Sequence, residues 1–319
     1  MPRKDRVAQP SSAVSAWVAA DPQSLRLLEQ ARKMAARSST VLIPGESGVG
    51  KDLLASLLHY LGPNAGEPLV KIDCASLPHE LVESELFGYE KGAFTGATQM
   101  KRGRLELAGA GTIVLYEVAA LPLAVQAKLL RAIEEKRFHR LGGARTVEVA
   151  ARIVALTNAD LAEAVARGAF REDLYYRLNV LPLSIPPLRE RPADIRPLAR
   201  RLLSQLAETH RGPARTLSTD ALAAFERYAF PGNVRELRNI LERALVSSAA
   251  PEVTLEALPA LVRQAASGRD RHKMTLEELE RAYIAEILDF TRGKKSKAAA
   301  ILGISRKTLL EKRKRYGLD

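Results

Sequence analysis

Short apolar runs alternate with segments of helical periodicity over the first part of the chain. Four runs have the length of a buried strand: 40–43, 69–72, 112–115 and 153–156. Apolar residues at helical spacing mark the segments 22–36, 123–136 and 161–167, and a further helix is expected from residue 51. Strands that alternate with helices predict an α/β fold with a parallel sheet covered on both faces.

Beyond residue 187 the pattern becomes helical. Apolar positions recur at helical spacing in 195–208, 219–228, 234–247 and 255–262, which predicts a helical lid beside the sheet. A polar stretch typical of a linker follows, and helices resume at residue 275. The pattern therefore predicts these parts: a flexible tail (1–20), an α/β region (21–187), a helical lid (188–262), a linker (263–274) and a small all-α end (275–319).

The composition shows an excess of basic residues and argues against an extracellular or membrane location. The 319 residues carry a net charge of +12, which favours nucleic acid or other anionic partners, although a solvated arginine-rich surface would give the same value. The single cysteine, Cys74, excludes an intrachain disulfide and lies in an apolar run typical of a buried residue. Since the chain lacks an apolar stretch long enough for a membrane span or a signal peptide, we expect a cytoplasmic protein with no membrane partner.

A glycine-rich loop follows the first apolar run. It matches the G-x-x-x-x-G-K spacing of a phosphate-binding loop with the residues Gly45, Glu46, Ser47, Gly48, Val49, Gly50 and Lys51. Its backbone N–H groups and the start of the next helix suit phosphate oxygens, and Lys51 is predicted to reach the β- and γ-phosphates of ATP. Asp52 stands where many such loops carry a serine or threonine for Mg²⁺. The alternative is a glycine-rich turn with a chance lysine.

The end of the chain is strongly basic. Its cationic residues are Arg292, Lys294, Lys295, Lys297, Arg306, Lys307, Lys312, Arg313, Lys314 and Arg315. Residues 297–309 are typical of a helix-turn-helix that binds double-stranded DNA, with Gly303 in the turn and Ser305 as the cap of the second helix. The predicted DNA contacts are Arg306, Lys307 and Thr308 on base edges and Lys312, Arg313 and Arg315 on phosphates. The alternative is a solvated basic helix.

One hexapeptide is far more specific than the rest. It reads GAFTGA and comprises Gly92, Ala93, Phe94, Thr95, Gly96 and Ala97. Taken alone it is a glycine-containing loop with an exposed aromatic residue. Together with residues 45–52, which are similar to the loop GESGTGKE, it makes residues 22–318 resemble the sigma-54-dependent activators, the bacterial enhancer-binding proteins of the nitrogen-regulator type. The resemblance implies an AAA+ P-loop parallel sheet with a helical lid, followed by a Fis-type helix-turn-helix.

The resemblance also implies roles for single residues. The GAFTGA loop is implied to contact sigma-54 when the nucleotide state changes. Asn158, after a predicted strand, matches the first nucleotide sensor, and Arg235 matches the sensor on the lid. Arg171 and Arg177 match arginine fingers that reach a neighbouring subunit, which implies self-assembly from dimer to hexamer. Other interpretations remain: an arginine in an ordinary salt bridge, and Asn233 as a simple helix cap.

The element that should hold Mg²⁺ departs from the family. The strand over 112–115 is followed by Tyr116 and Glu117. Glu117 matches the water-activating glutamate, but Tyr116 replaces the expected aspartate. A phenol with a pKa of about 10 is neutral near pH 7 and is a poor Mg²⁺ ligand. We therefore assign no metal ligand and predict that ATP binds while its hydrolysis to ADP and phosphate is weak or lost. Asp73, often asparagine in the family, could repel Glu117; alternatively Asp52 or Asp73 supports Mg²⁺ through water.

The resemblance thus implies an activator that binds ATP and enhancer DNA and remodels sigma-54 RNA polymerase. The alternative is a hydrolysis-deficient DNA-binding regulator that acts in mixed rings, and a third interpretation is an unrelated AAA+ remodelling ATPase. Since only about twenty residues precede the α/β region, we expect control to come from a separate partner, from expression level, or not at all.

Overall fold

The computed structural model describes residues 17–210, 213, 215–247, 250–266, 275–291 and 295–317. The chain divides into two compact units, of which the first ends at Leu258 and the second begins at Pro259. Among the described residues, every helix is too short or too polar to span a bilayer.

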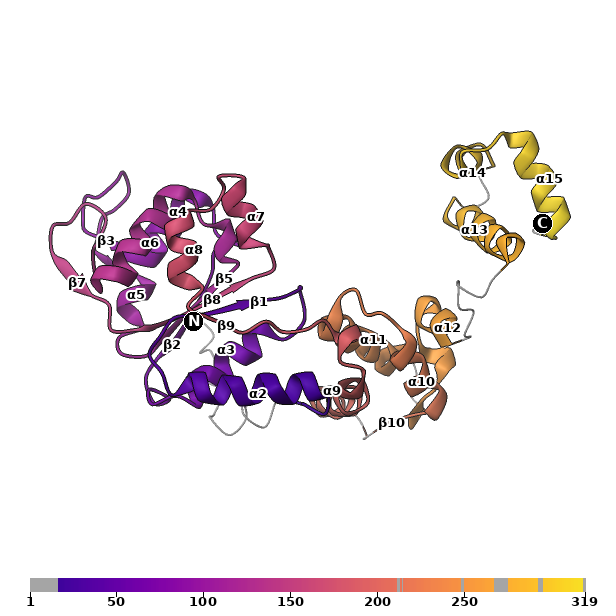
Figure 1. Cartoon of the computed structure of the whole chain (residues 1–319), viewed down its shortest axis with the longest axis horizontal. Helices are drawn as coiled ribbons and strands as arrows, with labels where there is room; N and C mark the ends of the chain where they lie inside the picture. Colours follow the sequence, from indigo (N-terminus) through magenta and orange to yellow (C-terminus); the bar gives the residue numbers. More distant parts are fainter. Residues whose placement is uncertain are drawn as a thin grey trace. The chain divides into compact units, whose positions relative to one another are not determined.

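A parallel five-stranded sheet with the order β2-β5-β8-β1-β9 forms the centre of the first unit (Figure 1). Its strands are β1 (Val41–Pro44), β2 (Leu69–Asp73), β5 (Thr112–Tyr116), β8 (Arg152–Thr157) and β9 (Leu181–Pro182). The apolar runs therefore form strands as predicted. The sequence missed β9 because so short a strand has no period to detect.

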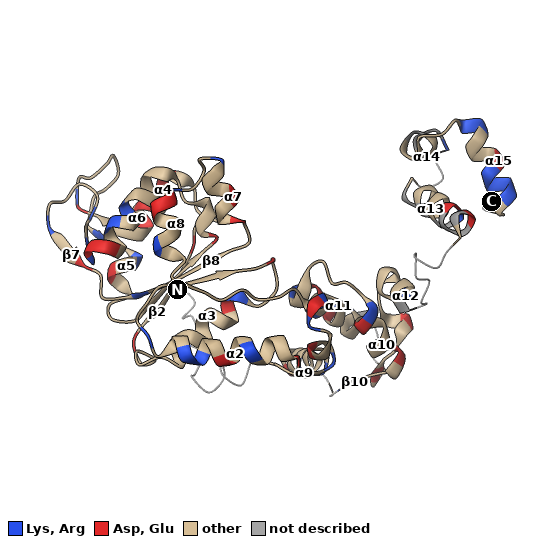
Figure 2. Ribbon diagram, in the orientation of Figure 1, with Lys and Arg blue, Asp and Glu red and all other residues tan. Residues whose placement is uncertain are grey.

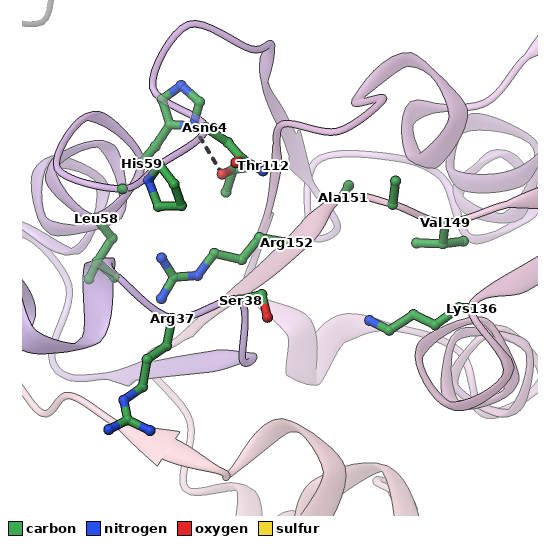
Figure 3. A pocket seen from close by; sticks show the side chains of 13 residues that line it. Arg37, Ser38, Leu58, His59, Asn64, Thr112, Lys136, Val149, Ala151 and Arg152 are labelled. Atoms are coloured by element: carbon green, nitrogen blue, oxygen red, sulfur yellow. Dashed lines mark hydrogen bonds between the residues drawn. The ribbon is translucent and has the colours of Figure 1, made fainter.

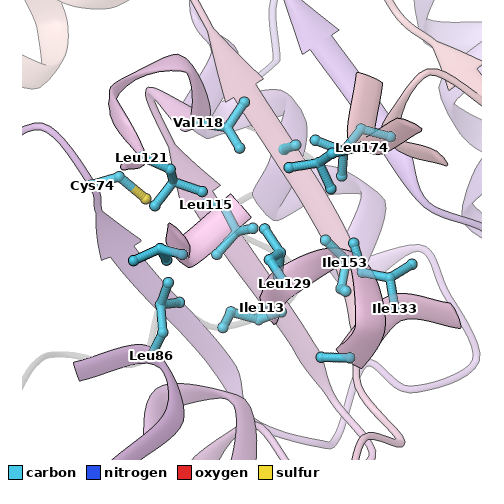
Figure 4. Close-up of a cluster of buried hydrophobic side chains, with 14 of the residues drawn as sticks. Cys74, Leu86, Ile113, Leu115, Val118, Leu121, Leu129, Ile133, Ile153 and Leu174 are labelled. Carbon is cyan, nitrogen blue, oxygen red and sulfur yellow. The ribbon is translucent and has the colours of Figure 1, made fainter. Parts of the chain in front are cut away.

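Alternate strand residues face two separate cores, because side chains alternate between the faces of a sheet. Val41 and Ile43 pack with α2 (Pro22–Ala35) and α3 (Lys51–Tyr60), while Leu42 joins the other core. That second core is drawn in Figure 4 and includes Cys74. Its helices are α4 (His79–Phe87), α5 (Arg104–Leu107), α6 (Leu123–Glu135), α7 (Leu161–Ala166) and α8 (Glu172–Leu178).

Two short antiparallel hairpins that the sequence did not predict project from the α/β part. One pairs β3 (Gly88–Tyr89) with β4 (Lys101–Arg102), and the other pairs β6 (Arg137–His139) with β7 (Thr146–Glu148). The GAFTGA residues lie in the connection of the first hairpin.

The first unit ends in the predicted helical lid. Its main elements are η2 (Leu188–Glu190), η3 (Pro192–Asp194), α9 (Ile195–Thr209), α10 (Thr219–Arg227), α11 (Asn233–Ser247), and the paired strands β10 (Thr216–Leu217) and β11 (Glu252–Val253). The predicted helix over 255–262 is wrong. The chain forms a 3-10 turn, η4 (Leu255–Ala257), extends at Leu258 and starts α12 (Ala260–Ala266) after Pro259. Proline lacks an N–H and disfavours helix in the preceding residue, so Pro259 separates the two.

The second unit contains α12 and three helices, α13 (Leu276–Phe290), α14 (Lys295–Leu302) and α15 (Arg306–Tyr316). The predicted linker began too early, because α12 continues to Ala266; residues 267–274 lie outside the described residues. Ala298 and Ala299 of α14 are buried in one core with Leu309 of α15. Alanines leave room for close helix approach, as the sequence suggested.

The turn between α14 and α15 has the predicted chemistry. Gly303 has φ +67°, a left-handed conformation that glycine adopts without a steric penalty. The Ser305 hydroxyl caps α15 by accepting the Thr308 N–H at 3.0 Å. Both predicted roles are confirmed.

The start of the folded unit lies earlier than the sequence predicted. Residues 1–16 of the expected tail lie outside the described residues, but Trp17 packs with the core of α2 and α3. The fully buried Asp194 carboxylate accepts the N–H groups of Ala20 at 2.6 Å and Asp21 at 2.8 Å. A flexible tail over residues 17–20 is therefore wrong, because a buried carboxylate holds the backbone there.

Candidate functional site

The glycine-rich loop joins the carboxyl end of β1 to the amino end of α3, as predicted. Gly45, Gly48 and Gly50 all have positive φ, at +155°, +80° and +111°. A Cβ on Gly48 would lie 2.4 Å from the Gly232 carbonyl oxygen of the lid, so only glycine fits there. The loop therefore has the backbone of a phosphate cradle and is in close contact with the lid.

Two cations converge on this loop. Lys51 is buried, and its ammonium group donates to the carbonyl oxygens of Gly45 at 2.5 Å and Glu46 at 3.3 Å. Arg235, from α11 of the lid, donates to the Ser47 hydroxyl at 2.6 Å. Burial lowers the pKa of Lys51, the charge of Glu117 opposes this, and the charge of Arg235 lowers the pKa further. Such an arrangement of like charges favours an anion between them.

Asn233 closes the lid onto the loop. It is fully buried, and its amide donates to the Glu46 carboxylate at 3.0 Å and to the Ser47 carbonyl at 3.1 Å, while its oxygen accepts the Leu188 N–H at 2.8 Å. The Asn233 side chain therefore holds the loop instead of capping α11. Glu236 of α11 accepts the Gly232 N–H just before the helix, at 2.8 Å.

Glu46 adds an ion pair to this closure. Arg189 donates to both of its carboxylate oxygens, at 2.6 and 3.0 Å. The hydrogen bonds from Arg189 and Asn233 lower the pKa of Glu46 from 4.5 to about 2. Neither Arg189 nor the amide of Asn233 was predicted, because both act across more than a hundred residues of sequence and have no local pattern.

Glu117 lies at the carboxyl edge of the sheet, where a water-activating residue is expected. Its φ of +48° is unusual for a residue other than glycine and is a local strain of the kind found at functional sites. Its carboxylate accepts the backbone N–H of Asn158 at 2.9 Å and lies 3.9 Å from the Lys51 ammonium nitrogen. Asn158 thus orients Glu117 through its backbone. Asp73 accepts the N–H groups of Ala75 and Ser76, at 3.0 and 3.3 Å.

Tyr116 is paired with the residue that follows the phosphate-loop lysine. Its hydroxyl donates to Oδ1 of Asp52, and the Lys71 ammonium group lies 2.5 Å from the same oxygen. The sequence predicted the departure at Tyr116 but not Lys71, which lies on β2 and meets Asp52 only in the fold.

These side chains do not fit a magnesium ion. Mg²⁺ prefers several hard oxygen ligands in near-octahedral geometry. Tyr116 offers a neutral phenol, and Oδ1 of Asp52 already accepts two donors, one of them cationic. Within the described part of the chain, no group of three or more His, Cys, Asp or Glu residues could hold a metal ion.

The GAFTGA loop lies at the surface. Phe94 is 45% exposed, and its ring packs edge-on against Tyr89 with 4.9 Å between centroids. Gly92 and Gly96 have φ of +85° and +102°, and the Gly92 N–H donates to the Ala97 carbonyl at 2.8 Å. The predicted tight turn with an exposed aromatic is confirmed, although Ala97 is buried at its base.

Arg140 anchors this loop to the neighbouring hairpin. It is buried, donates to Glu90 at 2.5 Å and forms a bidentate pair with Glu106 at 2.9 and 3.0 Å. A Cβ on Gly142 would lie 2.8 Å from Ala93, so the turn of the second hairpin lies directly against the GAFTGA loop. No local motif predicts this anchor, because Arg140 meets Glu90 and Glu106 only in the fold.

The predicted arginine fingers lie on or next to α8 and are exposed. Arg171 is paired within the chain to Asp173, with nitrogen–oxygen distances of 3.0 and 2.7 Å. Within the single chain, Arg171 therefore forms an ordinary salt bridge, which was the alternative interpretation. The roles of Arg171 and Arg177 across subunits stay predictions.

The basic residues of α15 fall into two groups (Figure 2). Arg306 and Lys307 are exposed at its amino end. Lys312 and Arg315 pair instead with Glu280 and Glu277 of α13, both at 2.6 Å. The latter two brace α15 against α13, so the amino-terminal group is the better candidate for DNA.

A separate cavity of about 260 Å³ lies at the amino ends of β5 and β8, the opposite edge of the sheet from the phosphate loop (Figure 3). Arg37, Lys136 and Arg152 line it, and the buried His59 contacts the Thr112 hydroxyl at 2.9 Å. Arg152 donates to the carbonyl oxygens of Met34, Ala35 and Ser39. It therefore anchors the end of α2.

Family models match consecutive parts of the chain. They describe a sigma-54 interaction domain over residues 17–184, an AAA+ ATPase lid domain over 189–275, and the Fis family of bacterial regulatory proteins over 275–316. Fold and site therefore define the class: an AAA+ domain with a lid, joined to a Fis-type helix-turn-helix. The chain belongs to the sigma-54-dependent transcriptional activators.

Relatives and solved structures agree with this family. The chain is 41% identical to the regulatory protein AtoC of Escherichia coli, with 93% of this chain and 67% of AtoC covered. It is 45% identical to the nitrogen fixation protein AnfA of Azotobacter vinelandii, with 91% and 55% covered. NtrX from Brucella abortus is 33% identical in both its ADP complex (TM-score 0.74, 96% of this chain and 71% of NtrX) and its ATP complex (0.71, 95% and 69%). The chain thus spans roughly half to two thirds of these curated relatives.

Proposed function

We propose that this chain activates sigma-54 RNA polymerase, binding ATP in the loop between β1 and α3 and enhancer DNA through α15. The nucleotide part rests on the convergence of two cations on the loop, Lys51 from the start of α3 and Arg235 from the lid. The ADP and ATP complexes of NtrX, which has the same architecture, support it.

In this proposal the loop lysine changes partners when a nucleotide binds. Lys51 leaves the carbonyls of Gly45 and Glu46 for phosphate oxygens, and Arg235 reaches the same phosphates from the lid. Glu117, oriented by the Asn158 N–H, positions the attacking water.

Phe94 at the surface of the GAFTGA loop contacts sigma-54, and Arg171 and Arg177 act on the nucleotide of a neighbouring copy. These roles require the chain to self-associate into an oligomer, from a dimer up to a hexamer. The protein acts in the cytoplasm, where its DNA and polymerase are.

A sigma-54 binding assay on the purified chain tests the proposal. We expect binding in the presence of a transition-state mimic of ATP hydrolysis and much weaker binding without nucleotide. If the chain binds the mimic but its sigma-54 binding stays equally weak with and without it, the GAFTGA loop does not respond to the nucleotide.

A second candidate function is favoured by the contact of Tyr116 and Lys71 with Asp52. The chain would bind nucleotide and DNA but hydrolyse ATP weakly or not at all, and would act in mixed rings with active subunits. Steady-state ATP turnover of the wild type beside Tyr116→Asp decides between the two. Normal turnover that Tyr116→Asp leaves unchanged rules out the second candidate.

A further inference from the structure

Lys71, Asp52 and Tyr116 form a polar cluster beside the phosphate-loop lysine. Asp52 follows Lys51 in the first turn of α3, while Lys71 and Tyr116 come from the neighbouring strands β2 and β5. We propose that this cradle binds its nucleotide without a divalent cation, with the Lys71 ammonium group supplying charge that a metal ion would otherwise bring. The inference rests on the proposed nucleotide-binding function and adds that the affinity does not depend on Mg²⁺.

The sheet places both strand residues on the face that carries α3. Tyr116 and Leu69 pack with the core of α2 and α3, whereas Ile72 belongs to the opposite core. Strand side chains alternate between faces, so Lys71, two residues after Leu69, also faces α3. The two donors therefore reach Asp52 from one direction and meet at its Oδ1 atom.

The cluster already balances the charge of Asp52. To bind Mg²⁺ through Oδ1, the protein would have to displace the Lys71 ammonium group and lose the Tyr116 hydrogen bond. Mg²⁺ also gives up its water reluctantly, and Tyr116 supplies no anionic oxygen in return. The exchange therefore loses favourable contacts without replacing them.

The same lysine is suited to a polyphosphate. Its side chain is 39% exposed, so it can move from Asp52 to a phosphate oxygen. Lysine binds phosphate as a compact point charge on a flexible stem. With Lys51 and Arg235 it would place three cations around the anion, and none of them requires a metal ion.

Isothermal titration calorimetry of the full chain with ADP, and with a non-hydrolysable ATP analogue, tests the inference. Each titration is run with excess MgCl₂ and with excess EDTA. We expect dissociation constants that agree within about threefold between the two conditions. Affinity that falls by about tenfold or more in EDTA overturns the inference and leaves the proposed function intact. Failure to bind in either condition overturns both.

Lys71→Gln tests the role of the ammonium group. The affinity in EDTA should fall by about tenfold, because a charge-assisted hydrogen bond to phosphate is lost. Lys33→Gln is the matched control, since Lys33 is an exposed lysine paired with Glu29 at 2.6 Å on α2, and it should change nothing. If Lys71→Gln binds as tightly as the wild type, Lys71 merely neutralises Asp52 and its proposed role is wrong.

Substitutions of Tyr116 test the metal directly. Tyr116→Asp places a second carboxylate beside Asp52 and should make nucleotide affinity about tenfold higher in Mg²⁺ than in EDTA. Tyr116→Phe removes the hydroxyl without adding a ligand and should keep affinity independent of Mg²⁺. Circular dichroism checks that each variant folds. If Tyr116→Asp does not fold, the titrations of Lys71→Gln decide whether the inference holds. Equal Mg²⁺ dependence in Tyr116→Phe and a folded Tyr116→Asp contradicts the inference.

Discussion

Asn233 is the residue on which closure of the lid over the phosphate loop depends most directly. Its buried amide joins the loop, through Glu46 and Ser47, to the backbone of Leu188. A buried amide that uses both its donor and its acceptor groups is costly to remove, because its partners are left without hydrogen bonds.

Asn233→Ala should therefore destabilise the first unit by about 1–3 kcal/mol, since it leaves the buried Leu188 N–H unpaired. Urea denaturation measures the loss. Asn239→Ala is the control on the same helix, because Asn239 is exposed, and alanine there should be neutral or slightly stabilising. Equal stability of the two variants would contradict the assigned role of Asn233.

Glu46 gives the same closure a pH dependence. Its pKa is lowered from 4.5 to about 2, first by Arg189 and then by Asn233. A carboxyl whose pKa is lower in the folded state contributes stability that is fully present above pH 4.5 and lost as the pH falls toward 2. The stability difference between wild type and Glu46→Gln should therefore shrink over this window, measured by denaturation at several pH values. A difference that stays constant from neutral pH to pH 2 would argue against the ion pair.

Residues within local motifs are predictable from the sequence, whereas residues that act at long range are not. Positions next to the expected elements are confirmed for the loop from Gly45 to Lys51, for Glu117 after β5 and for Ser305 before α15, because motif and element are adjacent in sequence. Lys71 and Arg140 were missed, because each side chain acquires its partners only when distant segments meet in the fold.

The two hairpins, β3 with β4 and β6 with β7, form the surface on which Phe94 is exposed. They are held together by Arg140, which bridges Glu90 at the base of one hairpin and Glu106 on α5. This anchor fixes the base of the loop while Phe94 stays exposed at its surface.

Phe94→Ala should lower stability by no more than about 1 kcal/mol, because the ring is nearly half exposed, but should abolish sigma-54 binding. Pull-down with purified sigma-54 and thermal denaturation measure the two effects. Met100→Ala, which changes an exposed apolar residue near the same hairpin, should retain binding. Loss of binding in both variants would mean that the surface acts without any special part for Phe94.

The strands and helices with a clear period were predictable to within a residue or two, whereas very short elements were not. The wrong helix over 255–262 is instructive, because its apolar spacing is helical but Pro259 prevents a continuous helix. The local effect of one proline outweighed the periodicity.

At the scale of the whole molecule, the order of sheet, lid and basic helix-turn-helix followed from the sequence. Periodicity predicted each part, and the family resemblance joined them into one protein. Assembly was expected only from the resemblance at Arg171 and Arg177, and within one chain Arg171 pairs with Asp173.

DNA binding by a dimer should depend steeply on salt. If a dimer neutralises about eight phosphates, log K falls against log salt with a slope of about −7. Fluorescence anisotropy with double-stranded DNA measures it. Arg306→Ala should weaken binding more than Lys312→Gln, because Lys312 is held by Glu280. A slope near zero would remove α15 from the DNA interface.

We propose that the loop between β1 and α3 holds a nucleotide that the lid residue Arg235 also contacts. Calorimetric titration of the purified chain with ADP tests it most directly, with Lys51→Ala and Arg235→Ala beside the wild type. We predict saturable binding that each substitution weakens by about tenfold or more, because each removes a charge-assisted hydrogen bond. A wild-type chain with no affinity for ADP or ATP, with or without magnesium, would show that this loop is not a nucleotide site.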